Sequence, residues 1–221
     1  MDIVIFDVGK TLVRATHKDI ILFLFKKRKV SLRFLLRVYI SFFFHKLGLI
    51  KDENVNSISI KLFNTMVKGW NTTEIQKILN ECFEKVIKPK IIPQSMELIK
   101  NHLEKKDIII LISAFIGYVI EDLKVHLNLK YAIYPKLEIS NNIFTGKIIG
   151  VFPYGKDKAV LVKELINNEK LKFNKSYCYA DRFSDRFLLE FVNNPCAINP
   201  DSNLRKLALQ NGWQIYDFKT V

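Results

Sequence analysis

The chain is poor in the residues that mark disordered or disulfide-stabilised proteins. Its 221 residues include 8 Gly, 6 Pro and 3 Cys, whereas 49% are hydrophobic. Low glycine and proline content with this hydrophobic share excludes a low-complexity chain and supplies enough apolar surface for a buried core. Three scattered cysteines are too few for a disulfide framework, which favours a reducing compartment.

Long uncharged apolar runs are also missing. The most apolar region, residues 19–50, is interrupted by cations at 26–29, 33, 37 and 46, and no run approaches the ~18 uncharged residues that a spanning helix needs. The N-terminus has no charged segment followed by a cleavable apolar stretch. We therefore expect a cytoplasmic protein without a spanning helix, with peripheral contact at the inner membrane surface as an open alternative.

Acidic residues are scarce relative to basic ones, and the imbalance is local. The formal net charge is +13, from 35 Lys and Arg against 22 Asp and Glu. Residues 14–51 contain ten Lys or Arg and a single acid, Asp19, and so carry +9 of that charge. Such a basic surface favours phosphorylated substrates, anionic lipid or nucleic acid. Nucleic acid is not expected, because the aromatic residues here are interleaved with aliphatic ones, as in a core, and no recognition motif appears.

Short apolar runs alternate with helical patterns, which is typical of a doubly wound, Rossmann-like α/β protein with a parallel sheet. The expected strands are residues 3–6, 107–112, 176–180, 196–198 and 213–216, and residues 136–149 are expected to form a β-hairpin arm. An all-helical stretch of amphipathic segments lies between the first two strands. We predict a core domain of residues 1–13 and 91–221, and a small helical cap domain of residues 14–90.

The segment Gly9-Lys10-Thr11 resembles the end of a phosphate-binding loop, G-x-x-x-x-G-K-[ST]. That loop needs its first glycine at the position of Val4, which lies inside the first predicted strand. Backbone inside a strand cannot wrap a phosphate, so we reject a nucleotide-binding loop.

Polar side chains instead follow the ends of successive predicted strands. In chain order, these strand-end and helix-start residues are Asp7, Ser113, Lys158, Asp181 and Asp185. The carboxyl ends of parallel strands meet at one edge of a sheet, where α/β proteins bind their ligands. We therefore expect these groups to lie together, as a nucleophile, a hydroxyl donor, a cation and a carboxylate pair for a metal.

Four motifs at these positions are similar to those of haloacid dehalogenase superfamily phosphatases, in the branch of phosphoserine-phosphatase-like proteins (subfamily IB). They are residues 6–12 (FDVGKTL), 111–114 (LISA), 155–161 (GKDKAVL) and 179–185 (YADRFSD). Residues 142–146 resemble the arm found in this branch, and the helical stretch lies where the family places its cap. The resemblance covers nearly the whole chain.

The resemblance implies a phosphatase that works through an aspartyl-phosphate intermediate. Asp7 would be the nucleophile. The other catalytic residues would be Thr11, Ser113 and Lys158. The substrate would be bound by Ser113, Ala114, Lys158 and Arg182. Arg182 also has a simpler interpretation, as an exposed arginine paired with a nearby carboxylate.

The resemblance also implies a cofactor, Mg²⁺. A site of oxygen ligands with retained waters suits this ion. Its ligands would be Asp7, Asp181, Asp185 and the backbone carbonyl of Gly9.

One residue departs from the family pattern. The family has a second aspartate two residues after the nucleophile, which serves as the acid–base for the leaving group and for water, and this chain has Gly9 there. Losing a positioned acid–base typically costs ~10²–10⁴ in rate. Three outcomes stay open: a phosphatase limited to good leaving groups, one that uses another acid–base, and a fold with little activity. His17 is near enough in sequence to be a substitute proton donor, but we favour an ordinary histidine at the hinge of the cap. We favour retained activity, because the nucleophile, the lysine and the metal-binding pair are all present.

The cap bears on the substrate. Phosphoserine is not expected, because Ala15, Thr16 and His17 stand near the position of the glutamate that binds the substrate amine in phosphoserine enzymes. Residues 32–44 suit either a helix that packs the core of the cap, which we favour, or one that lies on a membrane and receives a lipid phosphate. We expect a small or lipid phosphomonoester as substrate. The alternative function is a catalytically weak binding module whose basic cap docks on anionic lipid or another anionic partner.

Overall fold

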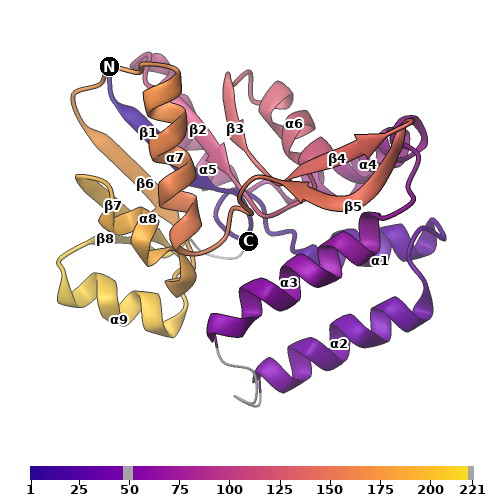
Figure 1. Ribbon diagram of the computed structural model, residues 1–221. Helices are drawn as coiled ribbons and strands as arrows, with labels where there is room; N and C mark the ends of the chain where they lie inside the picture. The colour runs from indigo at the N-terminus through magenta and orange to yellow at the C-terminus, as the bar shows by residue number, and fades with distance from the viewer. Residues whose placement is uncertain (47–51, 219–221) are drawn as a thin grey trace.

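The computed structural model describes residues 1–46 and 52–218 (Figure 1). A six-stranded parallel sheet with the order β3-β2-β1-β6-β7-β8 forms its centre. The strands are β1 (Ile3–Asp7), β2 (Ile108–Ile112), β3 (Tyr131–Ile133), β6 (Ser176–Ala180), β7 (Asn194–Ile198) and β8 (Gln214–Tyr216). The doubly wound α/β fold predicted from the sequence is confirmed.

Helices cover both faces of the sheet (Figure 1). One face carries α7 (Lys156–Asn168), α8 (Arg186–Glu190) and α9 (Ser202–Gln210), and the other carries α5 (Pro93–Glu104) and α6 (Gly117–His126). Ile3 and Ile5 of β1 belong to the buried apolar cluster on the face covered by α7, α8 and α9. Val4 and Phe6 belong to the buried apolar cluster on the opposite face, which α5 and α6 cover. Every residue of β1 is therefore buried, which explains why its sequence is a continuous apolar run rather than an alternating one.

The predicted helical cap contains α1 (His17–Lys26), α2 (Leu32–Lys46), α3 (Asp52–Val67), α4 (Thr72–Cys82) and the short helices η1 (Phe83–Ile87) and η2 (Lys88–Lys90). The two segments that join it to the core run side by side. Ile92 N–H donates to the Leu12 carbonyl, and Arg14 N–H donates to the Lys90 carbonyl, both at 2.8 Å. One buried apolar cluster nevertheless continues from Phe6 of the sheet into α4, so the division into two domains stays a prediction.

The antiparallel hairpin of β4 (Lys136–Ser140) and β5 (Ile143–Ile149) matches the predicted arm. Its backbone pairs with the cap: Gly69 N–H donates to the Phe144 carbonyl at 2.8 Å, and Phe144 N–H donates to the Trp70 carbonyl at 2.9 Å. Gly146 has a φ of +85° and lies so close to α3 that a Cβ atom there would be 2.8 Å from Cβ of Lys68. The arm therefore packs closely against the cap (Figure 1).

Strand β3 is not among the strands expected from the sequence. β3 has three half-buried residues, too few for an alternating pattern to be detected. It is defined by its pairing with β2, where Ile110 lies opposite Tyr131. This strand is therefore set by a tertiary contact rather than by local periodicity.

Candidate active site at the carboxyl ends of the strands

The predicted site residues lie at the carboxyl ends of three neighbouring strands. Asp7 is the last residue of β1, and Ser113 and Asp181 directly follow β2 and β6, the two strands that flank it. The strand order reverses at β1, because β2 and β3 extend from one side of it and β6, β7 and β8 from the other. Open α/β sheets bind their ligands at such a switch point.

Lys158 reaches this edge from the first turn of α7. Its Nζ is 2.6 Å from Oδ1 of Asp7 and 2.8 Å from Oδ1 of Asp185. Burial by itself disfavours the ammonium, but the charges of the Asp185 and Asp7 carboxylates overcome this and raise the pKa of Lys158. The lysine therefore stays charged and holds Asp7 in place. Lys156, two residues earlier, is exposed, as the sequence suggested.

Asp7, Asp181 and Asp185 form a buried group of carboxylates. One oxygen of each lies within 4.8 Å of the others. Burial raises the pKa of Asp181, and the charge of Asp7 raises it further; burial also raises the pKa of Asp185, despite the opposing charge of Lys158. Oδ1 of Asp181 is buried and makes no hydrogen bond to the described residues. Excess negative charge and an unpartnered carboxylate oxygen both fit a divalent cation that prefers oxygen ligands, such as Mg²⁺.

Two hydroxyl groups lie at the same edge. Thr11 Oγ1 donates to Oδ2 of Asp7 across a long 3.5 Å. Ser113 is buried, and its Oγ accepts a hydrogen bond from Phe115 N–H at 3.1 Å, which leaves the hydroxyl hydrogen to donate elsewhere. Ala114, between Ser113 and Phe115 in the chain, is half-buried. The structure thus brings the four catalytic candidates to one edge of the sheet.

The family model for haloacid dehalogenase-like hydrolases matches residues 4–190, a range that contains all of these side chains. The chain belongs to this family. The assignment made from the four motifs is therefore confirmed.

Individual relatives agree with the family. The chain is 30% identical over 176 residues to phosphoserine phosphatase SerB1 of Mycobacterium tuberculosis, covering 79% of this chain and 57% of that protein. It is 26% identical over 232 residues to the putative hydrolase ML2424 of Mycobacterium leprae, covering 98% and 72%. The chain therefore spans little more than half the length of the first of these relatives.

Solved structures show the same fold. A protein of unknown function from Bordetella pertussis Tohama I matches with a TM-score of 0.86 at 23% identity, covering 98% of each chain. A substrate-bound phosphoserine phosphatase matches with a TM-score of 0.66 at 15% identity, covering 93% of this chain and 89% of that chain. At these identities the likeness concerns the fold alone.

Gly9 is where this haloacid dehalogenase-like chain departs from the family motif, and Phe115 packs over it. A Cβ atom at Gly9 would be 3.3 Å from Cζ of Phe115, whose side chain is buried. The ring therefore fills part of the space that a longer side chain at position 9 would need. Sequence reasoning gave no role to Phe115, because an apolar residue acquires one only through its neighbour in space.

His17 begins α1 and reaches from the cap to the core. Its Nε2 is 3.3 Å from the Ala114 carbonyl oxygen, and its ring packs edge-on against Phe115 with centroids 4.5 Å apart. Desolvation and the charges of Arg182 and Lys158 lower the pKa of His17, although the Ala114 carbonyl opposes this. His17 as a whole is exposed at this position. A ring that is neutral near pH 7 is poorly suited to protonate a leaving group, so these contacts favour a link between cap and core.

Arg182 lies on the outer side of the site. Its side chain is 57% exposed, and its Nε is 3.6 Å from Oδ2 of Asp181. This contact matches the simpler interpretation of an exposed arginine paired with a carboxylate. It also places the guanidinium next to the carboxylate group, where substrate binding stays a proposal.

Asp201 is a positioning residue to which the sequence analysis gave no role. Its Oδ2 accepts from Phe183 N–H at 3.0 Å, and its N–H donates to the Asp181 carbonyl at 2.9 Å. Its Oδ1 caps α9 by accepting from Leu204 N–H at 2.8 Å. Asp201 thereby holds the loop that carries Asp181 and Asp185. An aspartate just before a helix is a recognisable cap in sequence, but its second contact is visible only in the fold.

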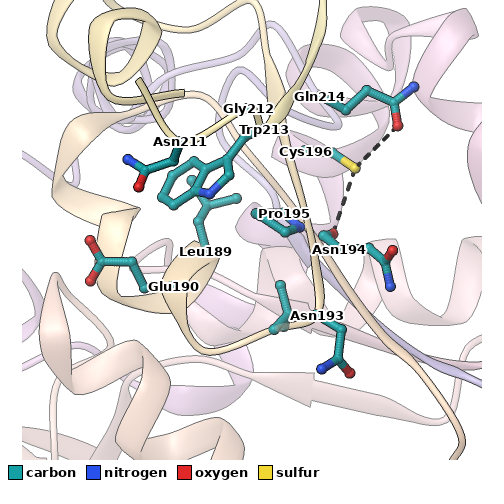
Figure 2. Close-up of a pocket in the computed structure, with 11 residues that line it drawn as sticks. Leu189, Glu190, Asn193, Asn194, Pro195, Cys196, Asn211, Gly212, Trp213 and Gln214 are labelled. Carbon is teal, nitrogen blue, oxygen red and sulfur yellow. Dashed lines mark hydrogen bonds between the residues drawn. The ribbon is translucent and has the colours of Figure 1, made fainter. Parts of the chain in front are cut away.

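A separate hollow of about 550 Å³ lies at the opposite edge of the sheet, at the start of β7 and β8. Figure 2 shows the Trp213 indole next to Leu189 and Asn211 in this hollow. Its lining does not include Asp7 or Lys158. Because α/β sheets bind ligands at the carboxyl ends of their strands, we place the candidate active site at the carboxylate group rather than here.

Proposed function

We propose that the protein is a Mg²⁺-dependent phosphomonoester hydrolase that forms an aspartyl phosphate on Asp7. The observation that carries the proposal is the buried group in which Lys158 bridges Asp7 and Asp185 beside Asp181. A carboxylate nucleophile held by a cation, next to an oxygen-lined cation site, provides what phosphoryl transfer needs. A relative named phosphoserine phosphatase supports this class of reaction.

The reaction proceeds in two displacements. A carboxylate oxygen of Asp7 attacks phosphorus, the bond to the leaving oxygen breaks, and the alkoxide takes a proton from water. Water then attacks phosphorus, its proton passes to solvent, and the bond to Asp7 breaks to release inorganic phosphate and restore the carboxylate. Lys158 offsets the charge of the transferring group, and Ser113 donates its hydroxyl hydrogen to a phosphoryl oxygen. Thr11 orients Asp7, and the backbone at Ala114 borders the phosphate.

The cation would be held by Asp7, Asp181, Asp185 and the Gly9 carbonyl, and when bound it would supply positive charge for the phosphoryl oxygens. The unpartnered Oδ1 of Asp181 supports this assignment. Thermal unfolding tests it without measuring activity. Mg²⁺ at a hundredfold excess over its Kd should stabilise the protein by about 2.7 kcal/mol, and Asp181→Asn should lose most of this gain. Equal stabilisation of both proteins would contradict the site.

Gly9 bears on which phosphomonoesters the protein can hydrolyse, because it supplies no acid for the leaving group. Without an acid beside the leaving oxygen, the rate should depend steeply on the leaving group, so that aryl phosphates react faster than alkyl phosphates. The substrate class is a small or lipid phosphomonoester. Phosphoserine is not proposed, because Asp19, the acid of α1, is engaged by Thr16 at 2.7 Å and by Lys90 at 2.6 Å rather than free for an amine.

Phosphate release from p-nitrophenyl phosphate and a panel of monoesters, with Mg²⁺ or with a chelator, tests the proposal. We expect metal-dependent release that Asp7→Asn lowers at least about 10³-fold. The control Asp157→Asn, in the first turn of α7, removes a carboxylate outside the buried group and should leave the rate unchanged. Release that survives Asp7→Asn would overturn the aspartyl-phosphate mechanism.

A second candidate is a catalytically weak module whose basic cap binds anionic lipid or another anionic partner. The observation that favours it is the packing of Phe115 over Gly9, which fills the place of an acid–base with apolar atoms. Failure of the wild-type chain to release phosphate from any monoester, with or without metal, would favour this candidate. Release restored by Gly9→Asp together with Phe115→Ala would then show that the remaining site is intact.

A further inference from the structure

Helix α2 has two apolar faces. Phe34, Leu35 and Val38 are at most 8% exposed and pack inside the cap, where α2 lies against α3. A second set of large hydrophobic side chains is between 42% and 61% exposed: Leu32, Leu36, Tyr39, Ile40, Phe43 and Phe44. In Figure 1, α2 is the outermost helix of the cap, with α1 and α3 between it and the sheet. Packing of the cap core explains the first face and leaves the second without a role.

The exposed side chains form one stripe along the helix. At about 100° per residue, positions 32, 36, 39 and 43 fall within roughly 60° of one another, and positions 40 and 44 lie beside them. From position 32 to position 44 the stripe runs about 18 Å along the helix axis. A contiguous exposed apolar patch marks an interaction site rather than ordinary surface.

Cations border the stripe on both sides. At the same 100° per residue, the exposed residues Arg33 and Arg37 of α2 fall next to positions 40 and 44, on one side of positions 32, 36, 39 and 43. Lys18 of α1 lies on the other side, with its Nζ 5.4 Å from the centroid of the Tyr39 ring. Exposed Lys26 extends the positive charge towards the loop that precedes α2. The sequence of α2 contains no acidic residue.

We propose that this stripe, residues 32, 36, 39, 40, 43 and 44, docks on the surface of an anionic membrane. An apolar face flanked by cations is the pattern of a helix that lies in the interface, with its apolar side chains at the acyl boundary and its cations among the lipid phosphates. Helix α2 has 15 residues and is about 22 Å long. None of the helices in residues 1–46 and 52–218 is long and apolar enough to cross a membrane. The contact is therefore lateral, and it does not depend on hydrolysis at Asp7.

A second copy of the chain fits the stripe less well than a lipid surface does. A symmetric dimer joins the same patch on both subunits. Its interface would bring Arg33, Arg37 and Lys18 of one protomer against the cations of its partner, and α2 offers no acid to pair with them. Like charges brought together at an interface oppose association. Anionic lipid headgroups supply the missing negative charge.

Co-sedimentation of the full chain with vesicles tests the proposal. The vesicles contain phosphatidylcholine alone or phosphatidylcholine mixed with phosphatidylglycerol, each at low and at high salt. We expect binding to the anionic vesicles that weakens as salt is added. Leu36→Ser with Phe43→Ser should weaken it roughly tenfold or more, because two apolar side chains leave the acyl boundary. Arg33→Gln with Arg37→Gln should weaken it by a similar factor.

Matched controls carry the same changes on helices of the core. Leu209 and Val125 are 69% and 72% exposed on α9 and α6, so Leu209→Ser with Val125→Ser removes comparable apolar surface. Lys163→Gln with Lys206→Gln removes the same charge. Both control pairs should leave binding within about twofold, and thermal unfolding checks that every variant is folded.

Three results would overturn the proposal. The first is a wild-type chain that stays in the supernatant with anionic vesicles. The second is control pairs that weaken binding as much as the α2 pairs do. The third is a stable dimer in sedimentation velocity that Phe43→Ser dissociates, which would show that a second copy covers the stripe.

Discussion

The carboxyl edge of the sheet and the outer face of α2 use charge in opposite ways. At the edge, Lys158 is buried and held between Asp7 and Asp185. On α2, Arg33 and Arg37 are exposed beside apolar side chains. The first arrangement fixes atoms at short distances and tolerates little change, because removing one partner leaves a buried charge. The second arrangement suits a class of partner rather than one molecule, because it acts through the exposed apolar area and the positive charge of α2. It therefore tolerates single substitutions.

Removing Lys158 should have the largest effect. Lys158→Met leaves the carboxylates of Asp7 and Asp185 buried without their cation, so we expect kcat to fall ~10²–10³-fold and the free energy of unfolding to fall by ~3–5 kcal/mol without Mg²⁺. Lys156→Met, on the exposed side of the same helix, should change stability by less than ~0.5 kcal/mol. Phosphate release and denaturant unfolding measure both. If the two variants lost similar amounts of activity and stability, the burial of Lys158 between two carboxylates would not be the cause of its effect.

Adjacent leucines on α2 separate its two apolar faces. Leu35 is 6% exposed and Leu36 is 54% exposed. Leu35→Ala should lower the free energy of unfolding by about 2–3 kcal/mol, because it leaves a cavity in the cap. Leu36→Ala should change it by no more than ~0.5 kcal/mol. Urea unfolding of both variants measures the difference, and comparable losses would mean that Leu36 is covered in the folded protein.

Substitutions at Gly9 and Phe115 should change the rate of phosphate release by a smaller factor than the loss of Lys158 does. Gly9→Asp alone should raise the hydrolysis of alkyl monoesters only slightly, because Phe115 lies 3.3 Å from the position of the new Cβ. Adding Phe115→Ala frees that space, and the rate should rise ~10–100-fold as an acid–base becomes available. Phe115→Ala alone is the control and should bring no gain. Additive effects in the cycle of four proteins would show that the two residues do not act as a pair.

Asp19 should give the smallest effect. It accepts from Thr16 N–H at 2.8 Å and from Lys90 Nζ at 2.6 Å, which joins α1 to the segment that returns to the core. Partial burial by itself would raise the pKa of Asp19, but the hydrogen bonds from Lys90 and Thr16 outweigh it and lower this pKa from 3.8 to about 2. A carboxyl group with a lowered pKa stabilises the fold above the unfolded pKa of about 4 and loses that contribution as pH falls towards 2.

Asp19→Asn keeps the shape of the side chain and removes its charge. Because this ion pair is partly exposed, we expect a cost of about 1 kcal/mol at neutral pH. The difference from wild type should shrink between about pH 4 and pH 2. Urea unfolding across this range measures it, and a cost that is independent of pH would show that the charge of Asp19 is not its source.

The fold and most of the site could be predicted because their signals are local. Buried parallel strands are short apolar runs, and Asp7, Ser113 and Asp181 stand directly at the ends of three of them. Parallel pairing then brings these residues to one edge without further information. Lys158 was identified through its motif, and its two carboxylate partners at 2.6 and 2.8 Å explain why it differs from Lys156.

Other parts of the site depend on contacts between distant segments. Phe115 matters because it lies over Gly9, which is more than a hundred residues earlier in the chain. His17 contacts Ala114 across a similar separation, and Asp201 supports Asp181 from the loop before α9. Apolar packing and backbone hydrogen bonds of this kind have no short-range pattern, so no spacing in the sequence reveals them.

By itself, the sequence determined the order of strands and helices apart from β3, the helical insertion after the first strand and the strand-end carboxylates. These follow from apolar periodicity and from where polar residues interrupt it. The tertiary structure alone decided which side chains of α2 are buried, because Leu35 and Leu36 are identical in chemistry and differ only in which one faces the rest of the cap. It also decided that the Phe115 ring covers position 9, because in a closely packed interior two side chains cannot occupy the same space.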